Sequence, residues 1–186
     1  DINVFVKVII RGNIREVERM IENGIDVNTM DAVGRLPLIV ACQSSYDMFE
    51  LLLNKGAKTN ILDGEGKFPL MYALELDKIN LLLKKGADPN FTDNDGNTAL
   101  HNWTKMAENP RSGSVERLEN INKIIEALIF NVPQADPTIE NNIGVRPIDH
   151  KLFGTLFKKL ETPHDMDDFL EYARRPEAVE YFLKKD

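Results

Sequence analysis

A short segment recurs three times in this chain at nearly constant spacing. The copies read NGIDVN at 23–28, KGAKTN at 55–60 and KGADPN at 85–90. Their glycines lie 32 and then 30 residues apart (56 minus 24, and 86 minus 56), and each copy follows apolar residues at helical spacing. A period of this length indicates stacked units, because one unit of roughly 30 residues cannot bury its apolar face alone.

A second marker lies between these copies. It is an Asp or Asn followed two residues later by Asp, Glu, Val or Ile and then by Gly, and it occurs as DAVG at 31–34, DGEG at 63–66, DNDG at 93–96 and NNIG at 141–144. Such a segment predicts a tight turn, in which Asp bonds its own backbone and Gly relieves strain. Pro37, Pro69 and Pro147 follow three of the turns, where they predict a first helical turn. Gly24, Gly56 and Gly86 each follow a stretch with apolar residues at helical spacing, and each is expected to end that helix in a left-handed conformation.

These markers, in this order, resemble the ankyrin repeat, whose pattern is D-x-x-G-x-T-P-L-H-x-A-A, a turn, an apolar helix and L-L-x-x-G-A-D-V-N. The resemblance covers about residues 3–150 and weakens beyond. It implies an all-α solenoid of stacked helix-turn-helix units with projecting β-turn fingers. About five repeat-like units are expected within 1–150, with a divergent helical cap at 161–186. The expected bounds are 1–30, 31–62, 63–92, 93–140 with an insertion at about 104–120, and a partial unit at 141–160.

Two units depart from the pattern. The third is a few residues short near 73–77, so we expect its two helices to join through a tighter turn. The fourth exceeds the family period by some fifteen residues. Its sequence predicts a loop at 109–113, an N-cap at Ser114 and a helix over 115–130. Trp103 replaces an alanine of the family pattern, and core packing is favoured over the alternative that its ring anchors a partner.

The first helix, over residues 4–10, is unusually apolar for a terminal unit. Either an upstream repeat or domain covers it, or Val4, Phe5 and Val8 face the second unit. The chain opens with Asp1 rather than Met, so we expect a fragment or a processed product.

Composition excludes some classes of function. The formal net charge is −7 and the isoelectric point is about 5.1, which argues against a nucleic-acid partner because phosphate binding needs a basic face. No apolar run approaches the roughly 20 residues that span a bilayer. The single cysteine, Cys42, excludes an internal disulfide and fits a reducing compartment. We therefore expect an intracellular, cytoplasmic protein, located in the host cytosol if it is a secreted effector.

The sequence offers little for catalysis. It holds three histidines and one cysteine, so we predict no enzyme, no catalytic residue, no cofactor and no metal site. The resemblance places His101 where a histidine bonds backbone across neighbouring units, and Cys42 where a small buried residue is needed. His150 and His164 lack neighbours at metal-ligand spacing. The segment 93–97 superficially suggests a calcium loop, but the carboxylates that such a loop needs at its first and last positions are missing.

The resemblance implies that a partner meets the finger tips and the inner face of the first helices. The positions that match are Met30, Ala32, Val33, Arg35, Gln43, Ser44, Leu62, Glu65, Lys67, Glu75, Leu76, Asn94, Asn97, Lys105 and Met106. Asn28, Asn60 and Asn90 are expected to bond the finger backbone. We predict a non-catalytic, monomeric module that binds another protein, with no nucleic-acid partner and no membrane insertion. The alternative is the targeting module of a larger multidomain enzyme or pathogen effector whose catalytic part is absent from this chain.

Overall fold

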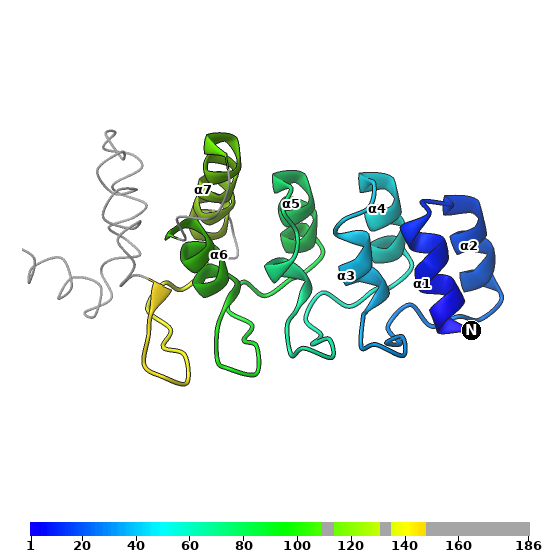
Figure 1. The fold of residues 1–186 in the computed structure, drawn as a ribbon, viewed down its shortest axis with the longest axis horizontal. Helices are drawn as coiled ribbons and strands as arrows, with labels where there is room; N and C mark the ends of the chain where they lie inside the picture. The colour runs from blue at the N-terminus through cyan, green and yellow to red at the C-terminus, as the bar shows by residue number, and fades with distance from the viewer. Residues whose placement is uncertain (109–113, 131–134, 148–186) are drawn as a thin grey trace, which may run out of the picture.

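A computed structural model describes residues 1–108, 114–130 and 135–147. The helices form pairs that stack side by side in one row (Figure 1). The pairs are α1 (Ile2–Ile10) with α2 (Ile14–Glu22), α3 (Pro37–Ala41) with α4 (Tyr46–Asn54), the 3-10 helix η1 (Pro69–Met71) with α5 (Leu76–Lys84), and α6 (Ala99–Glu108) with α7 (Val115–Phe130). We call these pairs the first to fourth units. The described residues contain no strand, so the expected all-α solenoid is confirmed.

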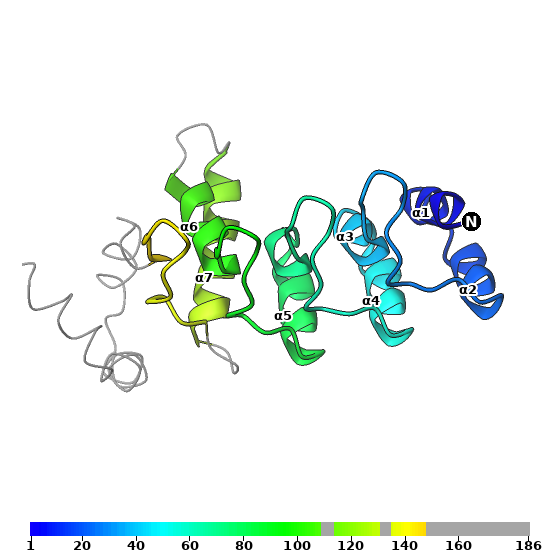
Figure 2. The ribbon, with the colours of Figure 1, turned by 90° about the horizontal axis from the view of Figure 1, so that it is seen from below.

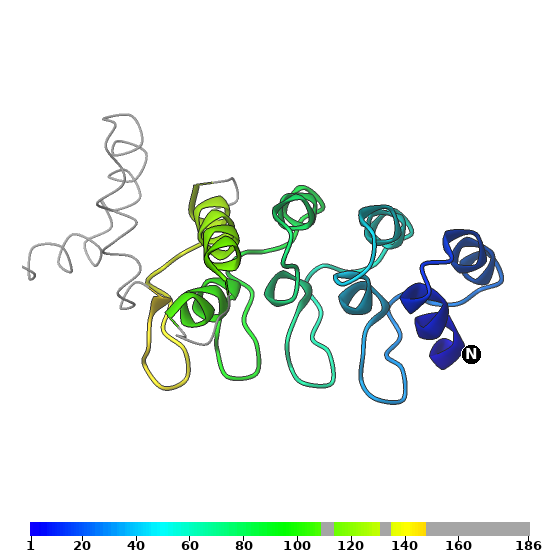
Figure 3. The ribbon, with the colours of Figure 1, turned by 45° about the horizontal axis from the view of Figure 1, so that its top comes forward.

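Each unit has two layers. The second helices α2, α4, α5 and α7 lie in one layer, and the first helices lie beside the projecting loops (Figure 3). We call the loops at 31–35, 63–67, 93–97 and 141–145 fingers two, three, four and five. Seen from below, fingers two to four follow one another along the stack (Figure 2). The inner surface of the molecule is therefore formed by fingers and first helices together.

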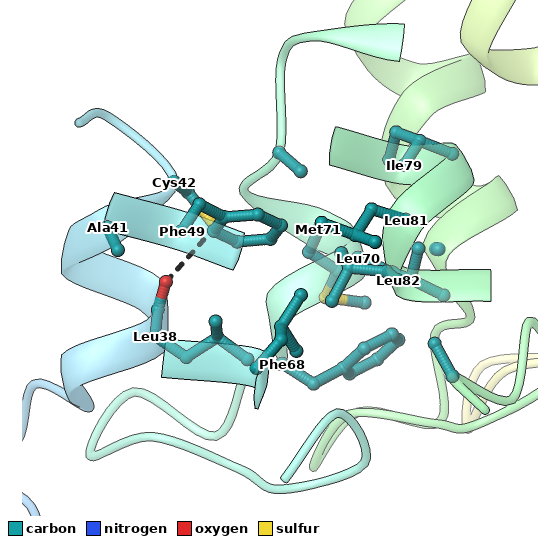
Figure 4. Close-up of a cluster of buried hydrophobic side chains, with 14 of the residues drawn as sticks. Leu38, Ala41, Cys42, Phe49, Phe68, Leu70, Met71, Ile79, Leu81 and Leu82 are labelled. Atoms are coloured by element: carbon teal, nitrogen blue, oxygen red, sulfur yellow. Dashed lines mark hydrogen bonds between the residues drawn. The ribbon is translucent and has the colours of Figure 1, made fainter. Parts of the chain in front are cut away.

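The core runs continuously through the stack. Phe5, Phe49, Phe68 and Leu82 are fully buried, and each comes from a different part of the first three units. Figure 4 shows how side chains of the second and third units interleave in this core. Because every unit covers the flank of its neighbour, burial rather than local propensity holds these short helices together.

Local signals position the helix ends as expected. Ser114 accepts a hydrogen bond from Arg117 N at 3.4 Å, and the helix that follows has the predicted bounds, Val115–Phe130. Pro37 and Pro69 begin the first helices of their units. Gly24, Gly56 and Gly86 follow the second helices with φ of 92°, 90° and 86°, as the resemblance implies.

The expectation for the third unit is wrong in one respect. The connection between its helices, 72–75, has four residues, as does the connection 42–45 of the second unit. The shortage falls instead on the first helix, which is reduced from the five residues of α3 to the three of η1. A single 3-10 turn satisfies few of its own carbonyls, so neighbouring side chains must bind them.

The terminal helix α1 is only partly covered. Phe5 and Val8 are buried and α1 packs against α3, whereas Val4 and Ile10 are exposed. The expected loop at 109–113, the helix exit at 131–134, the helices and cap beyond residue 147, and both His150 and His164 lie outside the described residues.

Candidate functional site

Each finger is closed by the side chain of its first residue. Asp31 Oδ1 accepts hydrogen bonds from Val33 N at 3.1 Å and Arg35 N at 2.9 Å. Asp63 does the same with the corresponding amides, at 2.9 Å each, and so does Asp93, at 2.9 and 2.7 Å. These bonds confirm the predicted turns and hold each finger in one conformation.

The second carboxylate oxygen, Oδ2, has a different partner in each of fingers two, three and four. Asp31 Oδ2 accepts from two guanidinium nitrogens of Arg35, at 2.7 and 2.8 Å. Burial alone would raise the pKa of Asp31, but the hydrogen bonds from Arg35 outweigh it and leave the pKa below its ordinary value. Asp93 Oδ2 accepts from the Asn97 amide at 3.1 Å.

In finger three the corresponding oxygen has a neutral partner. Asp63 Oδ2 accepts a hydrogen bond from the Tyr72 hydroxyl at 2.7 Å. Burial raises the pKa of Tyr72, and the hydrogen bond to Asp63 raises it further, so the phenol keeps its proton. Asp63 is therefore held by two amides and one hydroxyl, with no direct ion pair.

Neighbouring fingers bond to one another through the main chain. Gly64 N donates to Gly34 O at 2.8 Å, Asn94 N to Gly66 O at 3.2 Å, and Asn142 N to Asp95 O at 2.9 Å. Fingers two and three touch so closely that a Cβ added to Gly64 would lie 2.8 Å from the Gly34 Cα. The fingers consequently form a preorganised row rather than independent loops.

The asparagines that precede fingers two and three bond to the next unit. Asn28 donates to Gly56 O at 3.1 Å and accepts from Lys58 N at 2.8 Å. Asn60 makes the same pair of bonds with Gly86 O, at 3.2 Å, and Asp88 N, at 2.8 Å. These asparagines do bond backbone, but it is the backbone that follows the second helix of the next unit and not that of a finger, as had been expected.

A hollow of about 380 Å³ lies between fingers two and three and the first helices; we call it the first hollow. Five of the predicted binding residues line it: Val33, Arg35, Gln43, Ser44 and Glu65. The sequence did not single out its other lining residues, which are Ile10, Gly34, Ile39, Val40, Asp63 and Tyr72. Helix α1 thus contributes to a surface that had been assigned to later units.

A second hollow of about 340 Å³ follows between fingers three and four. The predicted residues Lys67, Asn97, Lys105 and Met106 line it, together with Asp93, Asp95, His101 and Asn102. Its lining is polar and holds two lysines, so it differs in chemistry from the first hollow.

The remaining predicted positions are scattered along the same surface. Met30, Ala32 and Asn94 are exposed on or beside the fingers. Leu62 and Leu76 are half-buried, and Leu62 packs against the core. Glu75 is bound by the ammonium of Lys78 at 2.8 Å. Ile143 is strongly exposed at the position in finger five that Val33 occupies in finger two, a correspondence that would have identified it.

Three residues have structural roles, as predicted. His101 Nδ1 accepts from Thr98 N at 3.0 Å and Nε2 lies 2.9 Å from Val145 O, so the ring joins finger five to α6. Cys42 is buried, and burial raises the pKa of its thiol to about 12, which makes it a poor nucleophile. Trp103 is fully buried and its Nε1 donates to Leu70 O at 2.9 Å, so core packing is confirmed.

The described ranges contain neither a cluster of metal ligands nor a helix suited to spanning a membrane. Among residues 1–108, 114–130 and 135–147, no three His, Cys, Asp or Glu side chains gather where they could hold a metal ion. In the same ranges no helix combines the length and the apolar character that crossing a bilayer requires.

Comparison with known protein families covers the first three units. Residues 4–93 match the family model described as ankyrin repeats, in three copies. No curated protein matches the chain significantly.

Proposed function

The chain belongs to the ankyrin-repeat family, and from this premise we propose that it binds a partner protein through the inner surface of fingers two to four and the first helices. Ankyrin repeats are generally protein–protein interaction modules and are typically non-catalytic. The observation that carries the proposal is the first hollow, where the strongly exposed Val33 and Ile10 stand beside Val40 on a preorganised framework. Aliphatic side chains grouped in this way are typical of a contact surface.

Rigidity supports the same proposal. The fingers are closed by Asp31, Asp63 and Asp93 and are bonded to one another through the main chain. A partner that binds here does not have to order these loops, which lowers the entropic cost of association. A rigid framework whose lining combines apolar and polar side chains suits specific binding of a partner chain.

The test uses two matched substitutions. Val33 and Val115 have the same side chain and the same exposed fraction, 73%, but Val115 begins α7 and lines neither hollow. Immobilised wild type, Val33→Glu and Val115→Glu are each incubated with the same cell lysate, and captured proteins are quantified by mass spectrometry. We expect Val33→Glu to lower capture of the specific partner by about tenfold or more, because a charge would lose its water at a position where the wild type buries an apolar side chain against the partner.

The control separates two surfaces. Val115→Glu is expected to capture the partner as well as wild type does. Undiminished capture by a folded Val33→Glu variant would refute binding through the inner surface. Loss of capture in Val115→Glu alone would move the interface to the start of α7.

A further inference from the structure

The first hollow has a mixed lining. Ile10, Val33 and Val40 contribute apolar side chains from α1, finger two and α3, and Asp63 and Glu65 contribute carboxylates from finger three. An apolar surface that ends at carboxylates matches one kind of protein side chain, a long aliphatic stem that carries a cation.

The charge of Asp63 is not balanced within its own finger. Lys67 occupies the position of finger three that Arg35 occupies in finger two, but its ammonium reaches Glu65 rather than Asp63. That contact is long, 3.5 Å, and both side chains are exposed, so it is weak. A carboxylate can accept about four hydrogen bonds, and the three made by Glu65 N, Lys67 N and the Tyr72 hydroxyl leave Asp63 with capacity for another.

Arg35 does not cancel this negative charge. Its guanidinium lines the hollow but is bound to the buried carboxylate of Asp31 through two nitrogens. Counting Asp31, Arg35, Asp63, Glu65 and Lys67 together leaves one negative charge in excess. The second hollow carries Lys67 and Lys105 next to its own carboxylates, so it favours a cation less.

We propose that the first hollow receives a lysine or arginine side chain of the partner, with its stem against Ile10, Val33 and Val40 and its cationic head at Glu65 and Asp63. The proposal rests on the proposed function and names the chemistry that the partner brings to it. A volume of about 380 Å³ accommodates such a side chain together with part of its backbone. Hydrogen bonds to the ionised carboxylates would anchor the head, since charge-assisted bonds are the stronger class.

The direct test uses defined probes. Nα-acetyl-lysine methylamide is titrated into the isotopically labelled protein, and amide chemical shifts are followed at Gly34, Gln43 and Glu65. The matched control probe is Nα-acetyl-norleucine methylamide, which keeps the four side-chain carbons and lacks the ammonium. We expect saturable shifts with the lysine probe and binding about tenfold weaker with the norleucine probe, because the latter makes no charge-assisted hydrogen bond.

Three variants are expected to change the affinity for the lysine probe in different ways. Glu65→Gln should weaken the lysine probe about fivefold, whereas Asp95→Asn, which removes a carboxylate from the same position of finger four, should leave it unchanged. Tyr72→Phe should strengthen it about threefold, because Asp63 Oδ2 loses its neutral donor and is free for the cation. A merely structural role of these residues would not produce changes of opposite sign.

The outcomes separate this inference from the function on which it rests. Equal shifts with the lysine and norleucine probes, or shifts that do not saturate, would overturn the basic-side-chain pocket even if Val33→Glu abolishes partner capture. Saturable lysine binding in a protein whose Val33→Glu variant still captures its partner would keep the pocket and refute its use in that interaction.

Discussion

Two interfaces in the stack differ in how the backbone carbonyls at the end of a first helix are hydrogen-bonded. One joins the first and second units, and the other joins the third and fourth. In the first interface, where α1 has nine residues, one hydroxyl crosses over: Ser44 Oγ donates to Ile9 O at 3.3 Å. In the other, where η1 has three residues, side chains of the fourth unit donate to three carbonyls of the third. Trp103 binds Leu70 O, Asn102 binds Met71 O and Asn120 binds Leu74 O.

The interface between the second and third units is intermediate. Helix α3 has five residues, and the ammonium of the fully buried Lys78 binds Cys42 O at 3.0 Å and Ser44 O at 2.6 Å. Helix ends leave several carbonyls without an internal partner, and a buried carbonyl without one is costly. Over the first three units the first helix shortens, and the next unit makes more hydrogen bonds to the carbonyls at its end.

The two irregular units, the third and the fourth, are connected by these hydrogen bonds. The third unit is short and the fourth is long, and the long unit carries the side chains that satisfy the short one. Trp103 stands where the family pattern has alanine, and its indole N–H reaches a carbonyl that a longer helix would have bonded itself. The short helix η1 thus depends on donors from the fourth unit for its carbonyl groups.

The largest expected effect tests this pairing at Trp103. Trp103→Ala should lower the free energy of unfolding by about 3–5 kcal/mol, since a large buried aromatic and its hydrogen bond are lost. Trp103→Phe keeps most of the packing and should cost about 1–3 kcal/mol, because Leu70 O loses its donor. Urea denaturation followed by circular dichroism measures both. A loss below 1 kcal/mol for Trp103→Ala would contradict the pairing.

The next effect concerns the intermediate interface. Lys78→Met keeps a similar aliphatic stem but removes the ammonium from the Cys42 and Ser44 carbonyls, and should cost about 2–3 kcal/mol in the same assay. Glu75→Gln is the matched control. Its carboxylate also binds Lys78, but the side chain is 60% exposed, so the loss should stay below about 1 kcal/mol. Equal losses in the two variants would mean that the ion pair, not the carbonyl contacts, matters.

The smallest effect is a pH dependence at the same interface. Burial raises the pKa of Cys42 from 9.0 to about 12, so the unfolded chain releases the thiol proton at lower pH than the folded chain does. This stability is present well below pH 9 and is lost as the pH rises from 9 toward 12; the loss amounts to roughly 1–2 kcal/mol at pH 10. Denaturation at pH 8 and pH 10 should show a smaller difference in Cys42→Ala than in wild type. An unchanged difference would argue against this contribution.

Much of the fold could be predicted because its signals are local. Ser114 predicted the start of α7, and the Asp-x-x-Gly segments predicted the fingers, since each depends on residues within four positions. The reduction of η1 could not be predicted, because a two-residue shortage can fall on the helix or on the turn and the spacing of glycines is the same. Its resolution depends on donors from the next unit.

The candidate site was predictable only within units. Val33, Gln43 and Glu65 follow from their positions in one repeat, and they do line the first hollow. Ile10 of the first unit and Tyr72 of the third also line that hollow. The pattern of a single repeat does not determine which side chains of different units meet. Leu62 matched a surface position, yet its apolar side chain packs against the core, since position in a pattern does not determine side-chain direction.

The backbone contact between Gly34 and Gly64 has a consequence for the first hollow. At this point no side chain separates the two finger backbones, so their spacing is set by a main-chain contact. Gly64 does not need a left-handed conformation, and even a methyl group there would force the fingers apart. The glycine pair thereby fixes the distance between two fingers whose side chains line the first hollow.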